Sequence, residues 1–206
     1  MSNTLPVFSI ERHRLVTDGQ GVTTLVGAYG CPLSCKYCLN PHVLIPATLE
    51  KCKYLTTEEL YELTKIDELY FLASGGGVTF GGGESLLHAD FIREFRSVCG
   101  PKWTLTVETS LNVPTAQLEK VLDSVTDYIV DIKDMNPAIY KAYTGKDNAQ
   151  VLCNLALLIS KVSPEHIKIR VPKIPDFNTE EDIAASVSKL KEMGFINIEV
   201  FPYIIR

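Results

Sequence analysis

Three cysteines, Cys31, Cys35 and Cys38, lie within the eight-residue segment CPLSCKYC. Thiolates this close in sequence can ligate a single metal centre. Zinc is one alternative, and His42 could provide its fourth ligand. Structural zinc sites, however, usually combine two separated two-ligand motifs, whereas three cysteines without an obvious fourth ligand suit an iron–sulfur cluster with one iron left open. The spacing therefore favours an iron–sulfur cluster.

The other three cysteines, Cys52, Cys99 and Cys153, are dispersed along the chain. The cytoplasm keeps thiols reduced, and a core of this size needs no disulfide framework. We therefore expect these three to be ordinary buried or half-buried thiols.

Composition narrows the class of protein. The 206 residues include 20 Lys and Arg, 25 Asp and Glu, and 46% hydrophobic residues, with a net charge of −5. These values predict a single domain over residues 1–206. A mildly acidic chain without a block of Lys or Arg lacks the electrostatic signature of a nucleic-acid-binding protein. Since no segment predicts a signal peptide or a membrane helix, we expect a cytoplasmic monomer with no nucleic-acid or membrane partner.

Apolar, β-branched runs alternate with amphipathic segments, which is typical of repeated βα units around a parallel sheet. Strands are predicted at 23–29, 77–80, 103–108, 128–131, 167–171 and 196–201. Helices are predicted from Thr56 onward and at 89–98, 115–122, 138–143, 151–161 and 179–193. Six units are fewer than the eight of a full barrel. We therefore expect an α/β fold, a partial (β/α)6 TIM-like barrel.

Polar residues and glycines follow the carboxyl ends of these strands, where α/β proteins place their chemistry. Besides the cysteine loop, they are Gly82, Gly83, Glu84, Glu108, Asp131, Lys133 and Arg170. Glycines allow a ligand to approach the backbone closely, so Gly82 and Gly83 should contribute more than the Glu84 carboxylate. Arg170 is the candidate for binding a carboxylate. The alternatives are a plain tight turn at the glycines and surface ion pairs elsewhere.

The cysteine segment, with Tyr37 before its last cysteine, resembles the Cys-x3-Cys-x-aromatic-Cys motif of the radical S-adenosylmethionine superfamily. Four further segments resemble the activating enzymes of glycyl radical enzymes, of the pyruvate formate-lyase activating enzyme type: 17–21 (TDGQG), 40–41 (NP), 74–79 (SGGGVT) and 131–136 (DIKDMN). The resemblance covers residues 8–203. No second cysteine-rich stretch lies between Cys38 and Gly75, as in activating enzymes without a ferredoxin-like insertion.

The resemblance implies a [4Fe-4S] cluster on the three cysteines, with S-adenosylmethionine bound to the fourth iron. It also implies reductive cleavage of S-adenosylmethionine, removal of a hydrogen from a glycine of a partner glycyl radical enzyme, and a flavodoxin- or ferredoxin-type reductant. The implied site residues are Asp18 for catalysis and Tyr37, Asn40, Gly82, Gly83, Glu84, Glu108, Asp131, Lys133 and Arg170 for cofactor binding. A monovalent cation near Glu108, Thr109 and Asp131 is implied as well.

Two positions depart from the family pattern. The family has an apolar residue and an arginine after Asp-Gly-x-Gly, whereas this chain has Val22 and Thr23. The substrate-positioning role of that arginine is therefore missing. Ile204 stands where relatives carry a histidine, and the family's helical tail does not follow, which predicts a compact variant, a truncated form or a changed task.

Two other functions stay open at this point. One is a radical S-adenosylmethionine enzyme that modifies a small molecule, as carboxy-deazaguanine synthases do. The other is a non-catalytic iron–sulfur or zinc-binding interaction module. A partial barrel is open along one side, which favours a protein loop as the substrate over a free small molecule. The histidines of the chain, His13, His42, His88 and His166, are expected to be bystanders.

Overall fold

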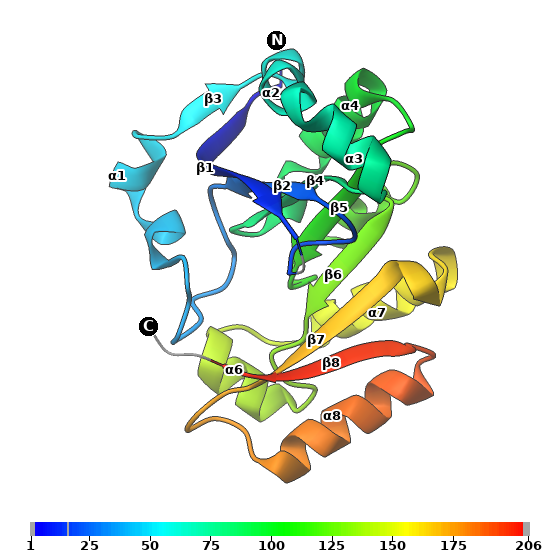
Figure 1. Ribbon diagram of the computed structural model, residues 1–206. Coiled ribbons are helices and arrows are strands. Elements are labelled where there is room, and N and C mark those ends of the chain that lie inside the picture. Colours follow the sequence, from blue (N-terminus) through cyan, green and yellow to red (C-terminus); the bar gives the residue numbers. More distant parts are fainter. Residues whose placement is uncertain (1–2, 16, 204–206) are drawn as a thin grey trace.

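One eight-stranded sheet organises the residues that this computed structural model describes, 3–15 and 17–203. Ile204 lies outside them. The strand order is β3-β1-β2-β4-β5-β6-β7-β8. Their bounds are β1 Leu5–Arg14, β2 Thr23–Ala28, β3 Lys53–Leu55, β4 Gly77–Gly82, β5 Thr104–Thr109, β6 Asp127–Asp131, β7 Ile167–Lys173 and β8 Asn197–Pro202. Figure 1 shows the strands following one another across the molecule.

The six predicted strands are confirmed: β2 and β4 to β8 pair in parallel, as successive βα units should. Two strands were missed. β1 pairs antiparallel with β2, and β3 pairs antiparallel with β1. The second half of β1 carries charged, largely exposed side chains, and β3 has only three residues, so neither shows an apolar run. The barrel is partial, because within the described residues β3 and β8 form the two edges of the sheet.

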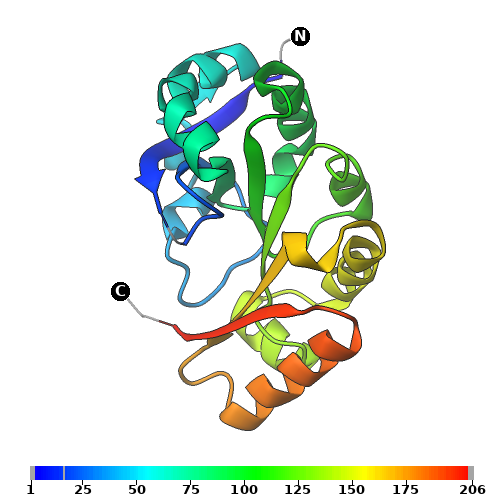
Figure 2. The same ribbon diagram turned by 45° about the vertical axis from the view of Figure 1, so that its right-hand side comes forward.

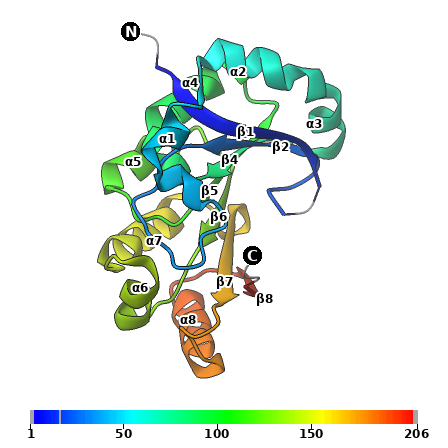
Figure 3. The same ribbon diagram turned by 90° about the vertical axis from the view of Figure 1, so that its left-hand side faces the viewer.

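The helices between the parallel strands lie on one face of the curved sheet (Figures 2 and 3). They are α2 Thr57–Thr64, α3 Glu68–Ser74, α4 Ala89–Cys99, α5 Thr115–Glu119, α6 Pro137–Thr144, α7 Ala149–Lys161 and α8 Glu180–Glu192. A capping box of Thr56 and Glu59 starts α2, as predicted. The predicted helix at 115–122 ends earlier, at Glu119, and α3 was not predicted.

Short segments complete the chain: α1 Pro46–Leu49 and the 3-10 turns η1 Pro41–Leu44, η2 Lys65–Asp67, η3 Ser85–His88 and η4 Pro164–His166. The core lies between the sheet and its helices, where strand residues such as Phe80 pack against Phe91 and Phe95 of α4. Among the described residues, no helix has the length and apolarity needed to cross a membrane.

Candidate active site

A cavity of about 360 Å³ lies at the carboxyl ends of the parallel strands. Twelve of the thirteen predicted site residues line it: Asp18, Cys31, Cys35, Cys38, Asn40, Gly82, Gly83, Glu84, Glu108, Asp131, Lys133 and Arg170. The exception is Tyr37. Its ring packs against Tyr143, Phe177 and Tyr203, and its hydroxyl donates to Asp176 at 3.1 Å. The topology thus brings together residues that are far apart in sequence.

The cysteine loop connects β2 to η1 and is tied to the end of α6. The backbone amides of Ser34 and Lys36 donate to the carbonyls of Thr144 and Tyr143 at 3.0 and 3.1 Å. Burial raises the pKa of Cys31 to about 12, and nearby thiolate charge at the other two cysteines adds to this effect. The Cys31 thiol is therefore protonated unless a positive centre binds it as a thiolate.

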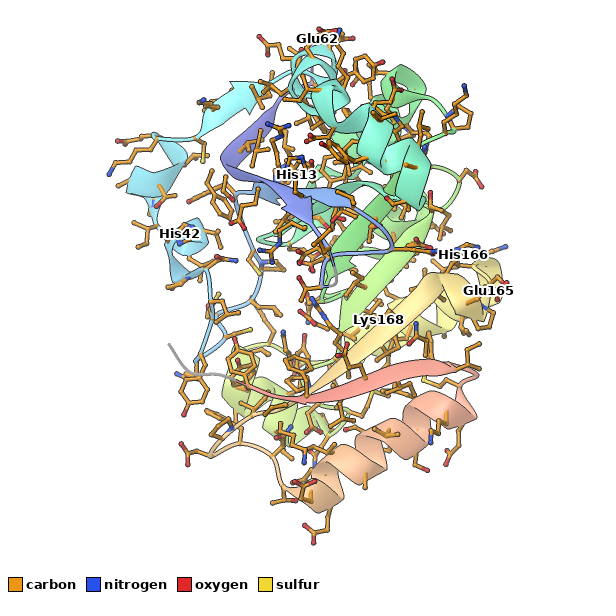
Figure 4. The ribbon with its side chains drawn as sticks, in the orientation of Figure 1. His13, His42, Glu62, Glu165, His166 and Lys168 are labelled. Atoms are coloured by element: carbon orange, nitrogen blue, oxygen red, sulfur yellow. The ribbon has the colours of Figure 1, made fainter. Side chains whose placement is uncertain are left out.

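A loop with three cysteines is the donor set of an iron–sulfur cluster with one open iron. Among the described residues, no three His, Cys, Asp or Glu side chains come close enough together to hold a single metal ion. A cluster does not need such convergence, since each cysteine binds a different iron. His42, the fourth ligand of the zinc alternative, lies on η1 (Figure 4). Its ring packs edge-on against Phe8 of β1, and it does not line the cavity.

The other cysteines and histidines lie away from this cavity. Cys52 is buried and Cys99 half-buried, as expected, but Cys153 is exposed. It lies on an outward face of the amphipathic helix α7, so the expectation that it would be covered was wrong.

The glycines at the end of β4 join this strand to the cysteine loop. The amide of Gly83 donates to the Ala28 carbonyl at 3.0 Å, and the amide of Glu84 donates to the Gly30 carbonyl at 2.8 Å. A Cβ atom on Gly83 would lie 2.1 Å from the Gly30 carbonyl oxygen, so only glycine fits this approach. Asn40 reaches back from the far side of the loop and donates to the Gly82 carbonyl at 3.0 Å.

The Glu84 carboxylate is buried and bonded within the protein. One oxygen accepts from Thr109 Oγ1 at 2.6 Å and from the Leu86 amide at 3.2 Å. The other accepts from the Ser110 hydroxyl and amide at 2.7 and 2.9 Å. The Glu84 carboxylate is therefore occupied by contacts within the protein.

Four charged side chains form a network across the ends of three strands. Arg170 donates to Asp131 Oδ1 at 2.8 Å and to Glu108 Oε1 at 3.2 Å, and Lys133 Nζ lies 3.4 Å from Asp131 Oδ2. Burial raises the pKa of Glu108 to about 7, against the charge of Arg170 and with the charges of Asp131 and Asp18 adding to the rise. Burial acts on Asp131 too, but the charges of Lys133 and Arg170 outweigh it, and its pKa is lowered.

Asp18 enters the cavity from the loop between β1 and β2. Its backbone carbonyl accepts from Thr79 Oγ1, which fixes the loop against β4. Its carboxylate oxygen Oδ2 accepts from Thr17 Oγ1 at 2.9 Å and from Arg14 Nε. Arg14 itself lines the cavity and was not predicted. No sequence signal marked it, because it lies outside the TDGQG segment, in a strand that was missed.

Known proteins resemble the chain over most of its length. The sequence profile of the Radical SAM superfamily matches residues 25–190. The pyruvate formate-lyase-activating enzyme of Clostridium pasteurianum is 32% identical over 96% of this chain and 81% of its own length. The (2S)-3-sulfopropanediol dehydratase activating enzyme of Klebsiella oxytoca is 28% identical over 84% of this chain and 73% of its own.

Solved structures share the fold at low sequence identity. Native anSMEcpe with bound AdoMet aligns with a TM-score of 0.64 at 17% identity, covering 85% of this chain and 49% of that chain. Streptococcus suis SuiB aligns with a TM-score of 0.63 at 14% identity, covering 85% of this chain and 38% of that chain. These alignments support the partial TIM-like barrel.

Proposed function

Because the chain belongs to the radical SAM superfamily and, within it, to the activating enzymes of glycyl radical enzymes, we propose that it removes a hydrogen atom from a glycine of a partner glycyl radical enzyme. The observation that carries the proposal is that the three-cysteine loop and the strand-end residues line the same cavity. When bound, the [4Fe-4S] cluster supplies an electron that cleaves S-adenosylmethionine to methionine and a 5′-deoxyadenosyl radical, which takes the glycine hydrogen.

The three cysteines would hold the cluster through three of its irons, which leaves the fourth for S-adenosylmethionine. The positive charges of Lys133 and Arg170 suit the methionine carboxylate. Gly82 and Gly83 line the cavity, where their backbone carbonyls are acceptors for the ammonium group, although the Gly82 carbonyl also accepts from Asn40. Asp131 and Glu108 are carboxylate acceptors for the ribose hydroxyls. The half-buried position of these groups supports their role, since low solvent exposure strengthens each contact.

A monovalent cation beside Glu108 and Asp131 is part of the proposal. Arg170 donates hydrogen bonds to both carboxylates. Burial nevertheless raises the pKa of Glu108, so the positive charge of Arg170 only partly compensates its negative charge. A cation there would favour the ionised form of Glu108. Thr109 Oγ1 already donates to Glu84, but it keeps a lone pair for such an ion. Potassium should therefore strengthen S-adenosylmethionine binding in the wild type, and should have less effect in Glu108→Gln.

The proposal extends to organisation and partners. Residues 1–206 would act as one radical SAM core domain without a ferredoxin-like insertion. The alignment with the K. oxytoca enzyme supports the absence of an insertion. It extends over 233 positions, more than the 206 residues of this chain, so the relative contains residues within the aligned region that this chain lacks. A flavodoxin- or ferredoxin-type protein would deliver the electron. Leu39, Leu44 and Ile45 are exposed just after the last cysteine and offer it a contact surface. The chain would act as a cytoplasmic monomer.

The test is an anaerobic reaction of the reduced, cluster-loaded protein with S-adenosylmethionine, with and without a purified glycyl radical enzyme. The pyruvate formate-lyase of C. pasteurianum is a suitable first partner, because its activating enzyme is 32% identical to this chain. The expected result is a glycine-centred EPR doublet on the partner together with 5′-deoxyadenosine. Efficient turnover of a free small molecule, with no radical on any protein partner, would favour the small-molecule alternative. Cluster binding without affinity for S-adenosylmethionine would favour the interaction module.

A further inference from the structure

The antiparallel pair of β1 and β2 contains an irregularity just before the loop that carries Asp18. Glu11 faces Leu25 and Arg14 faces Thr23, so between these pairs β1 has two residues, Arg12 and His13, where β2 has only Thr24. His13, labelled in Figure 4, has a φ of 58°. An extra residue in one of two paired strands is a β-bulge, and one bulge type contains a residue with positive φ; a bulge changes which face of the sheet the following side chains occupy.

The bulge sends Arg12 and Arg14 to opposite faces, although a regular strand would place both on one face. Arg12 Nε donates to the buried Asp67 at 2.7 Å, and Asp67 also accepts from Thr24 on the helix-covered face. Arg14 faces Thr23, whose side chain points to the other face, toward the Asp18 loop. The guanidinium of Arg14 therefore enters the cavity, beside Asp18.

Thr23 is the first residue of β2 and follows the loop that carries Asp18. Arg14 lies directly across the strand pair from it, and Thr23 Oγ1 lies 3.5 Å from the Arg14 carbonyl. Residues directly opposite in an antiparallel pair have Cβ atoms about 5 Å apart, well within the length of an arginine side chain. A guanidinium attached to either strand can thus reach the same region of the cavity.

We propose that Arg14 is a positioning residue that fixes the Asp18 carboxylate for the substrate. This inference rests on the proposed function. Arg14 Nε and Thr17 Oγ1 both donate to Asp18 Oδ2, and no donor to Asp18 Oδ1 is found in the described part of the chain. One oxygen is held; Asp18 is buried but lines the cavity, so a donor of the partner's loop would have to enter the cavity to reach the other oxygen. Arg14 Nη1 and Nη2 reach Glu11 at 3.3 Å and Thr17 at 3.2 Å, which keeps the guanidinium in place.

The first experiment compares Arg14→Met, which keeps much of the side-chain stem and removes the guanidinium, with Arg14→Lys. The readouts are the KM for the glycyl radical enzyme and the yield of glycyl radical per 5′-deoxyadenosine. We expect Arg14→Met to raise the KM or lower the yield about tenfold, as loss of a charge-assisted hydrogen bond would, with unchanged iron content. Arg14→Lys should lose less. An Arg14→Met protein with wild-type KM and yield would overturn the inference.

The exchange variant Arg14→Thr/Thr23→Arg moves the guanidinium to the opposite strand and tests whether it can hold Asp18 from there. It should recover at least half of what Arg14→Thr loses, and failure to recover in a protein with a wild-type melting temperature would contradict the proposal. Arg12→Gln is the matched control: it should lower the melting temperature by removing the contact with Asp67, without changing the yield. If Arg12→Gln lowers the yield as much as Arg14→Met, the yield depends on the integrity of β1 and not on the Arg14 guanidinium.

A double-mutant cycle of Arg14→Met and Asp18→Asn needs no partner protein. Arg14→Met should lower the melting temperature by less in Asp18→Asn than in the wild type, because the carboxylate charge that pairs with the guanidinium is already removed. Additive effects would overturn the inference whatever the activity. Wild-type protein that yields no glycyl radical, in a chain that still shows this coupling, would overturn the proposed function while supporting the contact between Arg14 and Asp18.

Discussion

Arg170 on β7 lies in register with Asp131 on β6, and its Nε donates a hydrogen bond to Asp131 Oδ1 at 2.8 Å. The same guanidinium reaches Glu108 on β5 at 3.2 Å. One side chain thus joins the ends of three neighbouring strands and sets the negative charge that a ligand in this cavity would meet. Arg170 thus compensates part of the negative charge of Asp131 and Glu108 before any ligand binds.

Replacing Asp131 tests whether this network binds S-adenosylmethionine. Asp131→Ala should weaken binding to the cluster-loaded protein by about 1–3 kcal/mol, because ligand groups lose an acceptor and Lys133 loses its partner. The measurement is a titration of S-adenosylmethionine followed by the EPR signal of the reduced cluster. Asp127→Asn, at the other end of β6, is the matched control and should bind normally, since Asp127 pairs with His166 away from the cavity. Equal affinity in both variants would remove Asp131 from the site.

The cysteine assignment predicts a sharp difference between two sets of variants. Replacing Cys31, Cys35 or Cys38 by alanine should in each case prevent stable cluster assembly, because only two protein ligands would then hold the four irons. The triple variant of Cys52, Cys99 and Cys153 should bind about four irons, because these thiols lie outside the cavity. Iron content and visible absorption after anaerobic reconstitution give the result. A triple variant without cluster, or stoichiometric zinc in anaerobically purified protein, would contradict the assignment.

The central parallel strands β4, β5 and β6 were predictable because most of their residues are buried, on both faces of the sheet, whereas β8 at the edge is largely exposed. In β6, for example, Tyr128, Ile129 and Val130 are all buried. The residues after such strands could then be assigned to one edge, since parallel strands end on the same side. This reasoning located Glu108 and Asp131 without any knowledge of their contacts.

Other features depend on contacts that the sequence does not encode locally. The face occupied by Arg14 depends on the bulge at His13, and nothing in ERHRL marks a positive φ. Asp67 belongs to a segment of polar residues, yet it is fully buried because Arg12 and His13 of β1 bond it. Glu84 is likewise an internal anchor only because Thr109 and Ser110 approach from the next strand.

The close approach of Gly83 to the cysteine loop predicts that even one methyl group is harmful there. In Gly83→Ala the new Cβ would overlap the Gly30 carbonyl, so the loop must shift, at a cost of about 1–3 kcal/mol or more in stability. Cluster content should fall with it, because Cys31 follows Gly30 directly. Gly145→Ala, at the end of α6, is the control: its φ of 76° costs about 1 kcal/mol, but no atom lies within 4 Å of the new methyl group. Normal iron content in Gly83→Ala would show that the loop adapts.

His88 is a partly buried histidine next to the cysteine loop, and it should make the stability of the protein depend on pH. Its Nε2 lies 2.8 Å from the Tyr29 carbonyl, and burial lowers its pKa below the ordinary value of 6.5, although that hydrogen bond acts in the opposite direction. Between the lowered pKa and about 6.5, the unfolded chain binds a proton that the folded chain does not. The stabilisation by neutral His88 is therefore complete above 6.5 and is lost as the pH falls below it.

His88→Gln keeps a donor for the Tyr29 carbonyl but cannot titrate. We expect it to have a melting temperature close to that of the wild type at pH 7.5 and a higher one than the wild type at pH 5.5, since only the wild type must keep a buried imidazole neutral as protons become available. Melting curves of both proteins between these pH values give the comparison, and the other titratable groups cancel because both chains contain them. A wild type that becomes more stable relative to His88→Gln as the pH falls would show that the folded chain favours the charged imidazole.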